Sequence, residues 1–240
     1  MKVGIFGRGR LASAVAGLMA PLDDMELAWM LGRDEVPPSV VDVALDASVG
    51  AAVPGHLAWA RESRTGIVVG ATGWDSRALA SESDWPIPVL VAPNFSLAVA
   101  YLRRVALTLG RLADLDPQTD LVVLERHHRA KLDAPSGTAR LLAGALAEGC
   151  PRYQSVGDPS RQLQARPLQI ASLRAGTEIG YHEMRLEGAH ETIVISHEAK
   201  SRELFAEGAI RALRWIKGKR GVFSFDDLAS ELLAPLFRIE

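Results

Sequence analysis

Short apolar runs alternate with helical stretches along the first part of the chain. Residues 3–6 predict a buried strand, and residues 10–20 predict a helix whose apolar side chains recur on one face. The later apolar runs are rich in β-branched residues and are separated by segments with helical spacing. This arrangement is typical of a parallel sheet covered on both faces. Further strands are expected at residues 27–31, 41–46, 67–70 and 89–92, with a helix at 51–63.

The pattern changes in the second part of the chain. Residues 168–174, 180–187 and 191–198 alternate between apolar and polar positions, and short turns separate them. Such alternation indicates half-buried strands, so these segments predict an antiparallel meander. Helices are expected at residues 97–113, 138–147 and 202–216, and a further apolar strand at 121–125.

These elements predict an α/β protein with two domains. We expect residues 1–96 to form a Rossmann-type parallel-sheet domain and residues 97–201 to form an α+β domain with an open mixed sheet. Residues 202–240 should return to the first domain, because a helical tail has no sheet of its own to cover.

Composition limits the class of function. The chain has 27 basic and 29 acidic residues and a net charge of -2, so it lacks the basic excess of a nucleic-acid-binding or membrane-surface protein. No window approaches the roughly 20 apolar residues of a membrane span. The single cysteine, Cys150, excludes an internal disulfide and fits a reducing compartment. We therefore expect a cytoplasmic protein that acts on a small molecule.

The first strand runs into a glycine-rich turn with the pattern G-x-G-x-x-A. The first glycine allows a tight turn, and the second lets the backbone approach a pyrophosphate. The helix that follows offers free N–H groups to the phosphates. A glycine-rich turn that binds no cofactor is the alternative. The segment is Gly7-Arg8-Gly9-Arg10-Leu11-Ala12.

The end of the second strand bears on the choice of cofactor. An NAD site usually has an acid here for the ribose 2′-hydroxyl, but this chain has Gly32 followed by Arg33. An arginine without the carboxylate suits a 2′-phosphate, which favours NADPH over NADH. Arg33 as a solvated loop charge, or Asp34 as the ribose partner, remain alternatives.

Two further loops follow strand ends, where ligands bind in α/β proteins. Both are small, polar and turn-prone, which allows a flat nicotinamide ring to lie against the backbone, although either could be only a turn. They are Gly70-Ala71-Thr72-Gly73-Trp74 and Ala92-Pro93-Asn94-Phe95-Ser96.

The most informative segment is Glu125–Ala139, which starts at the end of a predicted strand. Residues 126–131 hold five potential cations, including the pair His127 and His128 and the amine of Lys131. A run of charge is usually a solvated face, but histidines can exchange protons near neutral pH. The segment therefore predicts a site for proton transfer or anion binding.

A helix start follows this cation cluster. Pro135 suits the opening of a helix, Ser136 or Thr138 can cap it, and Gly137 leaves its N–H uncovered. Backbone donors beside cations form a site for an anion. The donors at the helix start and the cation cluster are two such surfaces, and together they suggest a dicarboxylate.

A metal site is not expected from the histidines. Adjacent histidines on a strand do not easily chelate one ion, and neither H-E-x-x-H nor C-x-x-C is present. His182, His190 and His197 lie on the predicted meander, where structural or surface roles are expected.

The residues quoted above resemble one family. The sequence E-x-H-H-x-x-K-x-D-A-P-S-G-T-A at Glu125–Ala139 is similar to that of the 4-hydroxy-tetrahydrodipicolinate reductases (dihydrodipicolinate reductases) of lysine and diaminopimelate biosynthesis. The loops at Gly7, Gly70 and Ala92 agree with it, as do Arg174-Ala-Gly176, Gly180-Tyr-His182 and Ser201–Ala206.

The resemblance implies a fold, a reaction and site residues. It implies a homotetramer, with cofactor bound by residues 1–96 and 202–240 and with substrate binding and oligomerisation in residues 97–201. The implied reaction is NAD(P)H-dependent reduction of 4-hydroxy-tetrahydrodipicolinate, with loss of water, to tetrahydrodipicolinate. His127 and Lys131 are the implied proton-transfer groups. The implied substrate contacts are His128, Ser136, Gly137 and Thr138, and the implied cofactor contacts are Gly7, Arg8, Gly9, Arg10, Leu11, Arg33, Gly70, Ala71, Thr72, Ala92, Pro93, Asn94 and Phe95.

Some positions depart from the family's pattern. Gly32 replaces the common acid, Ala71 the usual threonine and Ala130 the usual histidine. Two alternatives therefore stay open. One is a catalytically weak cofactor-binding or sensing homologue, and the other is a reductase of a different cyclic imine dicarboxylate.

Overall fold

The apolar run at the N-terminus becomes an interior strand of a parallel sheet. β1 (Lys2–Phe6) pairs in parallel with a strand on each side, and the side chains of Val3, Ile5 and Phe6 are almost completely buried. The other strands of this sheet are β2 (Glu26–Leu31), β3 (Val43–Asp46), β4 (Gly66–Val69), β5 (Pro88–Val91) and β11 (Gly221–Ser224), in the order β11-β5-β4-β3-β1-β2.

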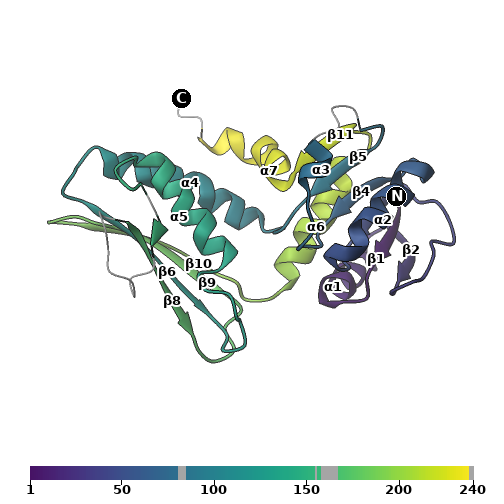
Figure 1. The fold of residues 1–240 in the computed structure, drawn as a ribbon, viewed down its shortest axis with the longest axis horizontal. Helices are drawn as coiled ribbons and strands as arrows, with labels where there is room; N and C mark the ends of the chain where they lie inside the picture. The colour runs from purple at the N-terminus through teal and green to yellow at the C-terminus, as the bar shows by residue number, and fades with distance from the viewer. Residues whose placement is uncertain (81–84, 155, 158–166, 238–240) are drawn as a thin grey trace. The chain divides into compact units, whose positions relative to one another are not determined.

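Helices cover both faces of this sheet in the computed structural model, which describes residues 1–80, 85–154, 156–157 and 167–237 (Figure 1). Val3 and Ile5 belong to one core, which includes helix residues such as Leu213, whereas Phe6 belongs to the core on the other face. The Rossmann-type fold predicted from the sequence is thereby confirmed. The helices are α1 (Arg10–Met19), α2 (Val53–Ser63), α3 (Arg77–Ala80), α6 (Glu203–Ile216) and α7 (Phe225–Leu233), with 3-10 turns η1 (Gly50–Ala52) and η2 (Ala234–Phe237).

The chain divides into two units, and the sheet above belongs to the unit of Met1–Leu97 and Arg202–Glu240. The second unit, Ala98–Ser201, contains a mixed sheet. Two helices cover one face of this sheet and bury Val123, Ile170 and Met184 against it. The elements are α4 (Leu97–Asp114), β6 (Asp120–His127), α5 (Gly137–Gly149), β7 (Val156–Gly157), β8 (Leu168–Arg174), β9 (Tyr181–Glu187) and β10 (Thr192–Glu198).

The predicted antiparallel meander is only partly correct. β9 and β10 form an antiparallel hairpin, but β8 does not pair with β9. β6 lies between them, parallel to β8 and antiparallel to β9, so the strand order is β10-β9-β6-β8-β7. Alternation along a strand shows which face is buried but not which strand is its neighbour, and the earlier β6 was therefore not placed in the meander.

The tail was also predicted incompletely. Its helix α6 packs against α1 and the parallel sheet, as expected. The tail contributes a strand as well, because β11 pairs in parallel with β5 at one edge of the sheet. β11 has four residues and is only half-buried, so its apolar signal is short. Among the described residues, no helix has the length and apolar character needed to cross a membrane.

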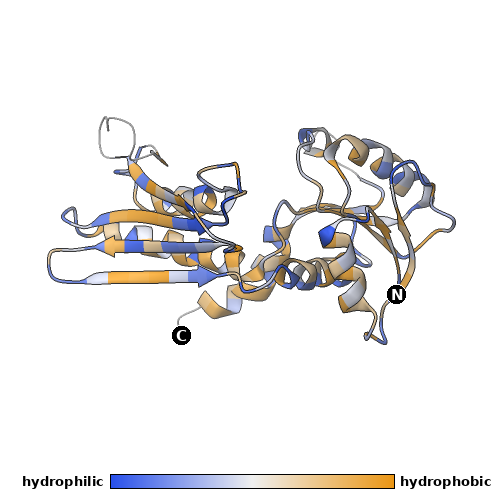
Figure 2. Cartoon of the chain, turned by 90° about the horizontal axis from the view of Figure 1, so that it is seen from below, coloured by the Kyte–Doolittle hydropathy of each residue, from blue (hydrophilic) through white to orange (hydrophobic). Residues whose placement is uncertain are grey.

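Polar side chains gather at one end of the mixed sheet. The register pairs His127 with Arg174, Glu125 with His182, and His182 with His197. Four neighbouring strands therefore bring charged and imidazole groups into one row. Figure 2 shows hydrophilic residues at the ends of β6 and β10, beyond hydrophobic stretches in the middle of the strands.

Candidate functional site

The glycine turn after β1 has the geometry of a phosphate-binding loop. Gly7 adopts a φ of 105°, and a Cβ at this position would lie 2.5 Å from the carbonyl oxygen of Ala47. Only glycine fits both requirements. Gly9 is the N-cap residue of α1. It has no side chain to cap the helix, and the space that a Cβ would take is open. The first N–H groups of α1 are thus accessible to an anion.

A cavity of about 520 Å³ begins at this turn. Four of the expected cofactor residues line it: Gly7, Arg8, Gly9 and Arg33. Asp34 and Glu35 line it as well, and the sequence analysis did not single out Glu35.

Glu35 places a carboxylate where the sequence analysis found only Gly32. Its Oε2 accepts hydrogen bonds from the Gly32 N–H at 2.9 Å and from Arg8 Nη2 at 2.8 Å. The turn that permits this contains Asp34, whose φ of 64° lies in the left-handed region that Asp tolerates. The acid therefore comes three residues later than the usual position, and spacing alone could not reveal it.

A second cavity, of about 420 Å³, lies in the same unit. Arg10, Leu11, Gly70, Pro93, Asn94 and Phe95 from the expected cofactor set line it, together with Arg202 and Phe205 from the tail. Three expected residues line neither cavity: Ala71 and Ala92 are buried, and Thr72 is exposed.

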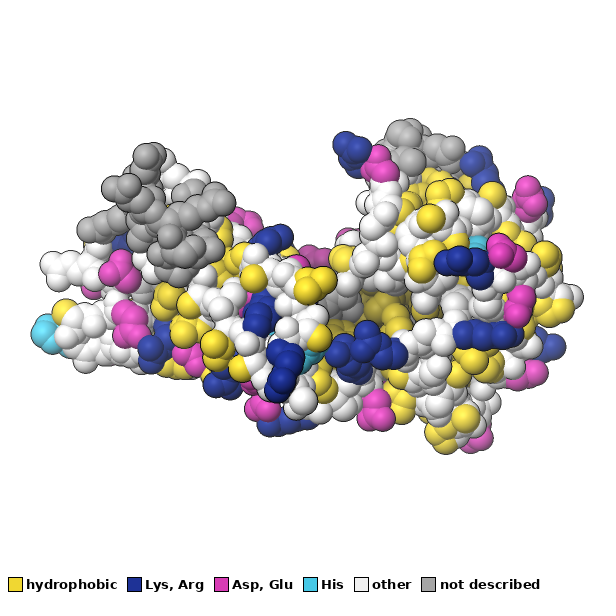
Figure 3. All heavy atoms as spheres, turned by 60° about the horizontal axis from the view of Figure 1, so that its bottom comes forward, with side chains coloured by type: hydrophobic (Ala, Val, Ile, Leu, Met, Phe, Trp, Pro, Cys, Tyr) yellow, Lys and Arg dark blue, Asp and Glu magenta, His cyan; other side chains and the backbone are white. Residues whose placement is uncertain are grey.

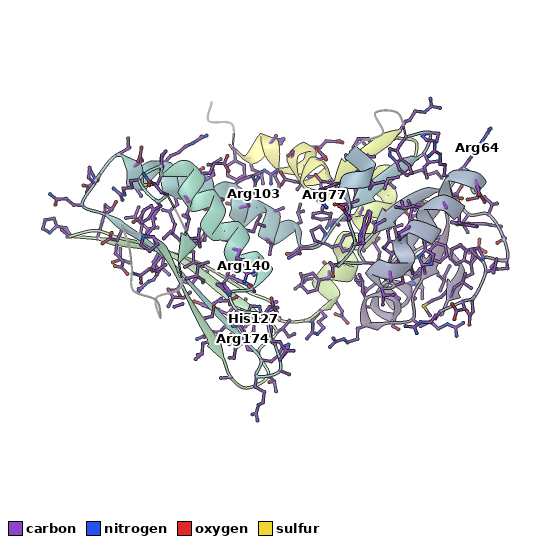
Figure 4. The ribbon with its side chains drawn as sticks, viewed as in Figure 1. Arg64, Arg77, Arg103, His127, Arg140 and Arg174 are labelled. Atoms are coloured by element: carbon purple, nitrogen blue, oxygen red, sulfur yellow. The ribbon has the colours of Figure 1, made fainter. Side chains whose placement is uncertain are left out.

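In the second unit, Glu125 forms the centre of the polar row. Its side chain is completely buried. Oε1 accepts three hydrogen bonds: from the Ser136 N–H at 3.0 Å, from Ser172 Oγ at 2.7 Å and from Arg174 Nη2 at 2.7 Å. Figure 4 shows Arg174 beside His127 at the ends of their strands, with Arg140 on α5.

These donors determine the charge of Glu125. Burial raises the pKa of the Glu125 carboxyl, but the hydrogen bonds from Ser136, Arg174 and Ser172 outweigh it and lower the pKa to about 2. The side chain is therefore a carboxylate at neutral pH. Arg174 was quoted for the family resemblance, but no contact was assigned to it, since residues 49 positions apart meet only through the parallel β6–β8 pairing.

Oε2 of Glu125 faces two imidazoles. His127 Nδ1 lies 3.4 Å from it and His182 Nε2 lies 3.9 Å from it. Burial lowers the pKa of His127, although the Glu125 charge raises it, and burial lowers the pKa of His182 to about 4. His182 Nε2 also lies 3.3 Å from Ser136 Oγ. The expectation of a merely structural His182 did not anticipate this contact with the predicted site.

The predicted helix start lies beside this carboxylate. Ser136 is the N-cap of α5, and its Oγ accepts a hydrogen bond from the Ala139 N–H at 3.2 Å. Gly137 has open space around the position of a Cβ, and Thr138 is half-buried. The start of α5 therefore contacts Glu125 through the Ser136 N–H, and the same carboxylate faces His127.

Lys131 and His128 lie in the turn between β6 and α5. The His128 N–H donates to the carbonyl oxygen of Glu178 at 2.7 Å, and Lys131 Nζ lies 2.8 Å from Asp133 Oδ1. Lys131 is close enough to His127 to lower the pKa of that imidazole. Lys131 is thus a second cation, after Arg174, that acts on the imidazole of His127.

Glu125, His127 and His182 could in principle hold a metal ion. One ligand atom from each lies within 4.8 Å of the others, a cluster that adjacent-histidine spacing did not reveal. Two features oppose this reading. The other oxygen of Glu125 is paired with Arg174, and Lys131 acts on the same imidazole, so a divalent cation would meet two positive charges. We interpret the cluster as a carboxylate–imidazole network.

The surface is in keeping with the near-neutral net charge. Figure 3 shows Lys and Arg side chains among acidic and hydrophobic ones over the face that it presents.

Comparison with protein families gives two matches along the chain. The family described as "Dihydrodipicolinate reductase, N-terminus" matches residues 1–95, and "Dihydrodipicolinate reductase, C-terminus" matches residues 97–229.

Individual relatives are named 4-hydroxy-tetrahydrodipicolinate reductase. The 4-hydroxy-tetrahydrodipicolinate reductase of Gluconobacter oxydans (strain 621H) is 41% identical over 194 residues, which is 78% of this chain and 76% of that protein. The reductase of the same name from Acidiphilium cryptum (strain JF-5) is 36% identical over 242 residues, covering 95% of this chain and 97% of that protein.

Solved structures share the fold. A dipicolinate-bound dihydrodipicolinate reductase from Paenisporosarcina sp. TG-14 aligns with a TM-score of 0.72 at 22% identity, over 95% of this chain and 99% of that one. An amine dehydrogenase from Mycobacterium smegmatis aligns with a TM-score of 0.59 at 11% identity, over 94% and 95% of the two chains.

Proposed function

The chain belongs to the dihydrodipicolinate reductase family, and we propose that it reduces 4-hydroxy-tetrahydrodipicolinate to tetrahydrodipicolinate with NAD(P)H. In this reaction the substrate gains one hydride and one proton and loses one water. The observation that carries the proposal is the buried His127, which faces an ionised carboxylate that also accepts a hydrogen bond from the Ser136 N–H at the start of α5. Proton exchange and anion binding are thereby available at one place.

The unit of the parallel sheet is the proposed cofactor domain. The glycine turn and the cavity beside it fit a dinucleotide, because accessible N–H groups of α1 suit a pyrophosphate. The nicotinamide, when bound, supplies the hydride. Gly70, Pro93, Asn94 and Phe95 line the second cavity, which suits the ring end of the cofactor.

We propose NADPH as the preferred cofactor, with NADH also accepted. Arg8 and Arg33 line the same cavity as Glu35 and could neutralise a 2′-phosphate. Glu35 opposes the phosphate and suits the 2′-hydroxyl of NADH, but Arg8 already neutralises part of its charge. Asp34 lines the cavity as well, so two arginines face two carboxylates, and the proposed preference for NADPH is moderate and depends on Arg33, since Arg8 is paired with Glu35.

The substrate is proposed to bind in the second unit. Its carboxylates would be held by backbone N–H groups and hydroxyls at Ser136, Gly137 and Thr138 and by the imidazole of His128. His127 is the proposed proton donor and acceptor, and Lys131 a proton donor. As negative charge develops on the substrate, the positive charge of these groups stabilises the transition state.

Among the described residues of the second unit, helices cover one face of the mixed sheet and leave the other uncovered, which supports a homotetramer. α4 and α5 cover only one face, and Leu173 and Val194 on the other face are 55% and 48% exposed. Apolar side chains on an open face favour association between copies of the chain. Light scattering of the wild type and of Val194→Glu tests this: a tetramer that the substitution weakens is expected, whereas a wild-type monomer would contradict it.

Steady-state kinetics test the proposed function. Enzymatically generated 4-hydroxy-tetrahydrodipicolinate should drive oxidation of NADPH, and of NADH at lower efficiency, in proportion to the protein added. Cofactor binding without turnover would instead indicate a cofactor-binding homologue. Turnover only with other cyclic imine dicarboxylates would overturn the proposed substrate.

A further inference from the structure

We infer that Glu125 is a positioning residue that holds His127 in the tautomer with the proton on Nδ1 and leaves Nε2 to exchange protons with the substrate. The inference rests on the proposed role of His127. It assigns to Glu125 a function for which the family resemblance offered no role.

Two unsatisfied atoms point to this contact. Within the described part of the chain, Glu125 Oε2 and His127 Nδ1 are both buried without a hydrogen-bond partner. They lie 3.4 Å apart, one an ionised acceptor and the other a possible donor. A shift of a few tenths of an ångström makes the hydrogen bond and satisfies both atoms, whereas apart they remain two buried polar atoms without a partner, which is unfavourable.

The other end of the carboxylate cannot turn away to find another partner. Oε1 is held by the Ser136 N–H, Ser172 Oγ and Arg174 Nη2 at 2.7–3.0 Å. These three donors come from the start of α5 and from β8, so Glu125 is fixed by two separate elements. Oε2 must therefore face the imidazoles of His127 and His182.

The opposite side of the His127 ring is kept open by Gly180. A Cβ at Gly180 would lie 3.1 Å from His127 Nε2, which is closer than most real contacts of a Cβ. With Nδ1–H on Glu125, Nε2 carries a lone pair in the neutral ring and a proton in the charged ring. The ring can then accept a proton and return it without rotating.

Glu125 also compensates the charge of the protonated ring. The groups that act on His127 are Glu125 on its own strand, Arg174 on β8, His182 on β9, and Lys131 and Asp133 in the turn before α5. Arg174 and Lys131 oppose a positive imidazole, and burial opposes it further. The Glu125 charge is the largest interaction favouring the protonated ring, and because the pKa of Glu125 is about 2, the proton stays on the imidazole.

Glu125→Gln tests the inference because it reverses the hydrogen bond. Ser136, Ser172 and Arg174 all donate to Oε1, so the amide oxygen must take that position and the amide NH₂ must face His127 Nδ1. An N–H donor there selects the Nε2–H tautomer, which is the wrong one for accepting a proton. We expect kcat to fall by about 100-fold or more with KM little changed, and the limb of the kcat/KM profile that reports His127 to move to lower pH.

Ser172→Ala is the matched control. It removes one donor to Oε1 and leaves Oε2 unchanged, so it should perturb the same network with a far smaller loss of kcat. Equal losses in both variants, a Glu125→Gln variant that changes only KM, or an unchanged pH profile would each overturn the inference. Thermal unfolding of both variants confirms that folded protein is compared.

A measurement on the wild type does not depend on turnover. Nitrogen NMR of the histidine rings, with His127 assigned from the signal lost in His127→Asn, reports the tautomer in the free enzyme. The Nδ1–H form supports the inference, and the Nε2–H form refutes it. If the NMR shows Nδ1–H but the wild type does not reduce the proposed substrate, the proposed function fails and the positioning role of Glu125 survives.

Discussion

At the scale of single residues, two glutamates show how partners determine what a carboxylate does. Glu35 is paired with Arg8 on the wall of an open cavity, where it can exchange partners with a ligand. Glu125 is buried and held at Oε1 by three donors. Because the first is accessible and the second is not, Glu35 suits selection of a ligand and Glu125 suits orientation of a side chain.

The close approach of Gly180 to His127 predicts the effect of a substitution on kcat. Gly180→Ala should crowd Nε2 of His127, because the added methyl lies 3.1 Å from it, and kcat should fall at least about 10-fold, as for other supports of a catalytic group. The matched control is Gly144→Ala in α5, where a Cβ meets nothing within 4 Å and helix propensity improves. Steady-state kinetics on both variants check this. A Gly180→Ala enzyme as active as Gly144→Ala would show that the space beside Nε2 of His127 does not matter for turnover.

The cavity proposed to bind the cofactor allows a second prediction at this scale. Arg33→Ala should weaken NADPH binding by about 1 kcal/mol or more and NADH binding less, because only NADPH carries the 2′-phosphate. Glu35→Gln should raise the preference for NADPH, since an opposing charge is removed. Dissociation constants from fluorescence titration measure both effects, with the exposed Arg211→Ala on α6 as a control. Equal changes for the two cofactors would contradict the assignment.

At the scale of elements, periodicity predicted where helices and strands occur better than it predicted which strands lie side by side. The helix start at Ser136 was expected from Pro-Ser-Gly-Thr, and Ser136 is indeed the N-cap of α5. The short strand β11 was missed, and so was the insertion of β6 between β8 and β9. Local propensity determines caps, whereas strand neighbours depend on the packing of distant segments.

The same distinction applies to the site. His127, Lys131 and the α5 turn are close in sequence, and their proximity could be predicted from one motif. Arg174 and His182 reach Glu125 only through register with β6, and Glu35 reaches Gly32 only through a left-handed turn. Periodicity in a single sequence does not show which residues of two paired strands lie opposite each other.

Two helix caps allow a prediction for an element. Ser136→Ala and Ser224→Ala each remove the side chain that caps a helix, α5 and α7 respectively, so each should lower the free energy of unfolding by about 1 kcal/mol. Only Ser136→Ala should also raise KM for the substrate, because only α5 is proposed to bind it. Denaturant unfolding and kinetics separate the two effects, and a similar KM in both variants would argue against a substrate site at α5.

At the scale of the whole molecule, buried histidines couple stability to pH. The pKa of His182 is lowered by burial from 6.5 to about 4 in the folded chain, so protons bind the unfolded chain more readily. The stabilising contribution of neutral His182 is present above pH 6.5 and is lost as the pH falls towards 4. His127 and His197 have pKa values lowered in the same direction.

The protein should therefore begin to lose stability to acid between pH 6.5 and 4. The free energy of unfolding should decrease between pH 6.5 and 4, and His182→Gln should flatten that decrease because glutamine does not titrate. Substitution of the exposed His190 by glutamine should leave the slope unchanged. Urea unfolding at several pH values measures both slopes, and identical slopes in wild type and His182→Gln would refute the coupling.

The parallel-sheet unit is built from both ends of the chain, and this has a consequence for the order in which the protein is made. Residues 98–201 leave the ribosome as one continuous unit, whereas the preceding unit still lacks α6 and β11 at that moment. Without them β5 has an open edge, and the core around Ile5 lacks Leu213 and Ala209. The second unit is therefore complete in the nascent chain before the first one, so the unit proposed to bind the dinucleotide can finish folding only after the second unit has been made.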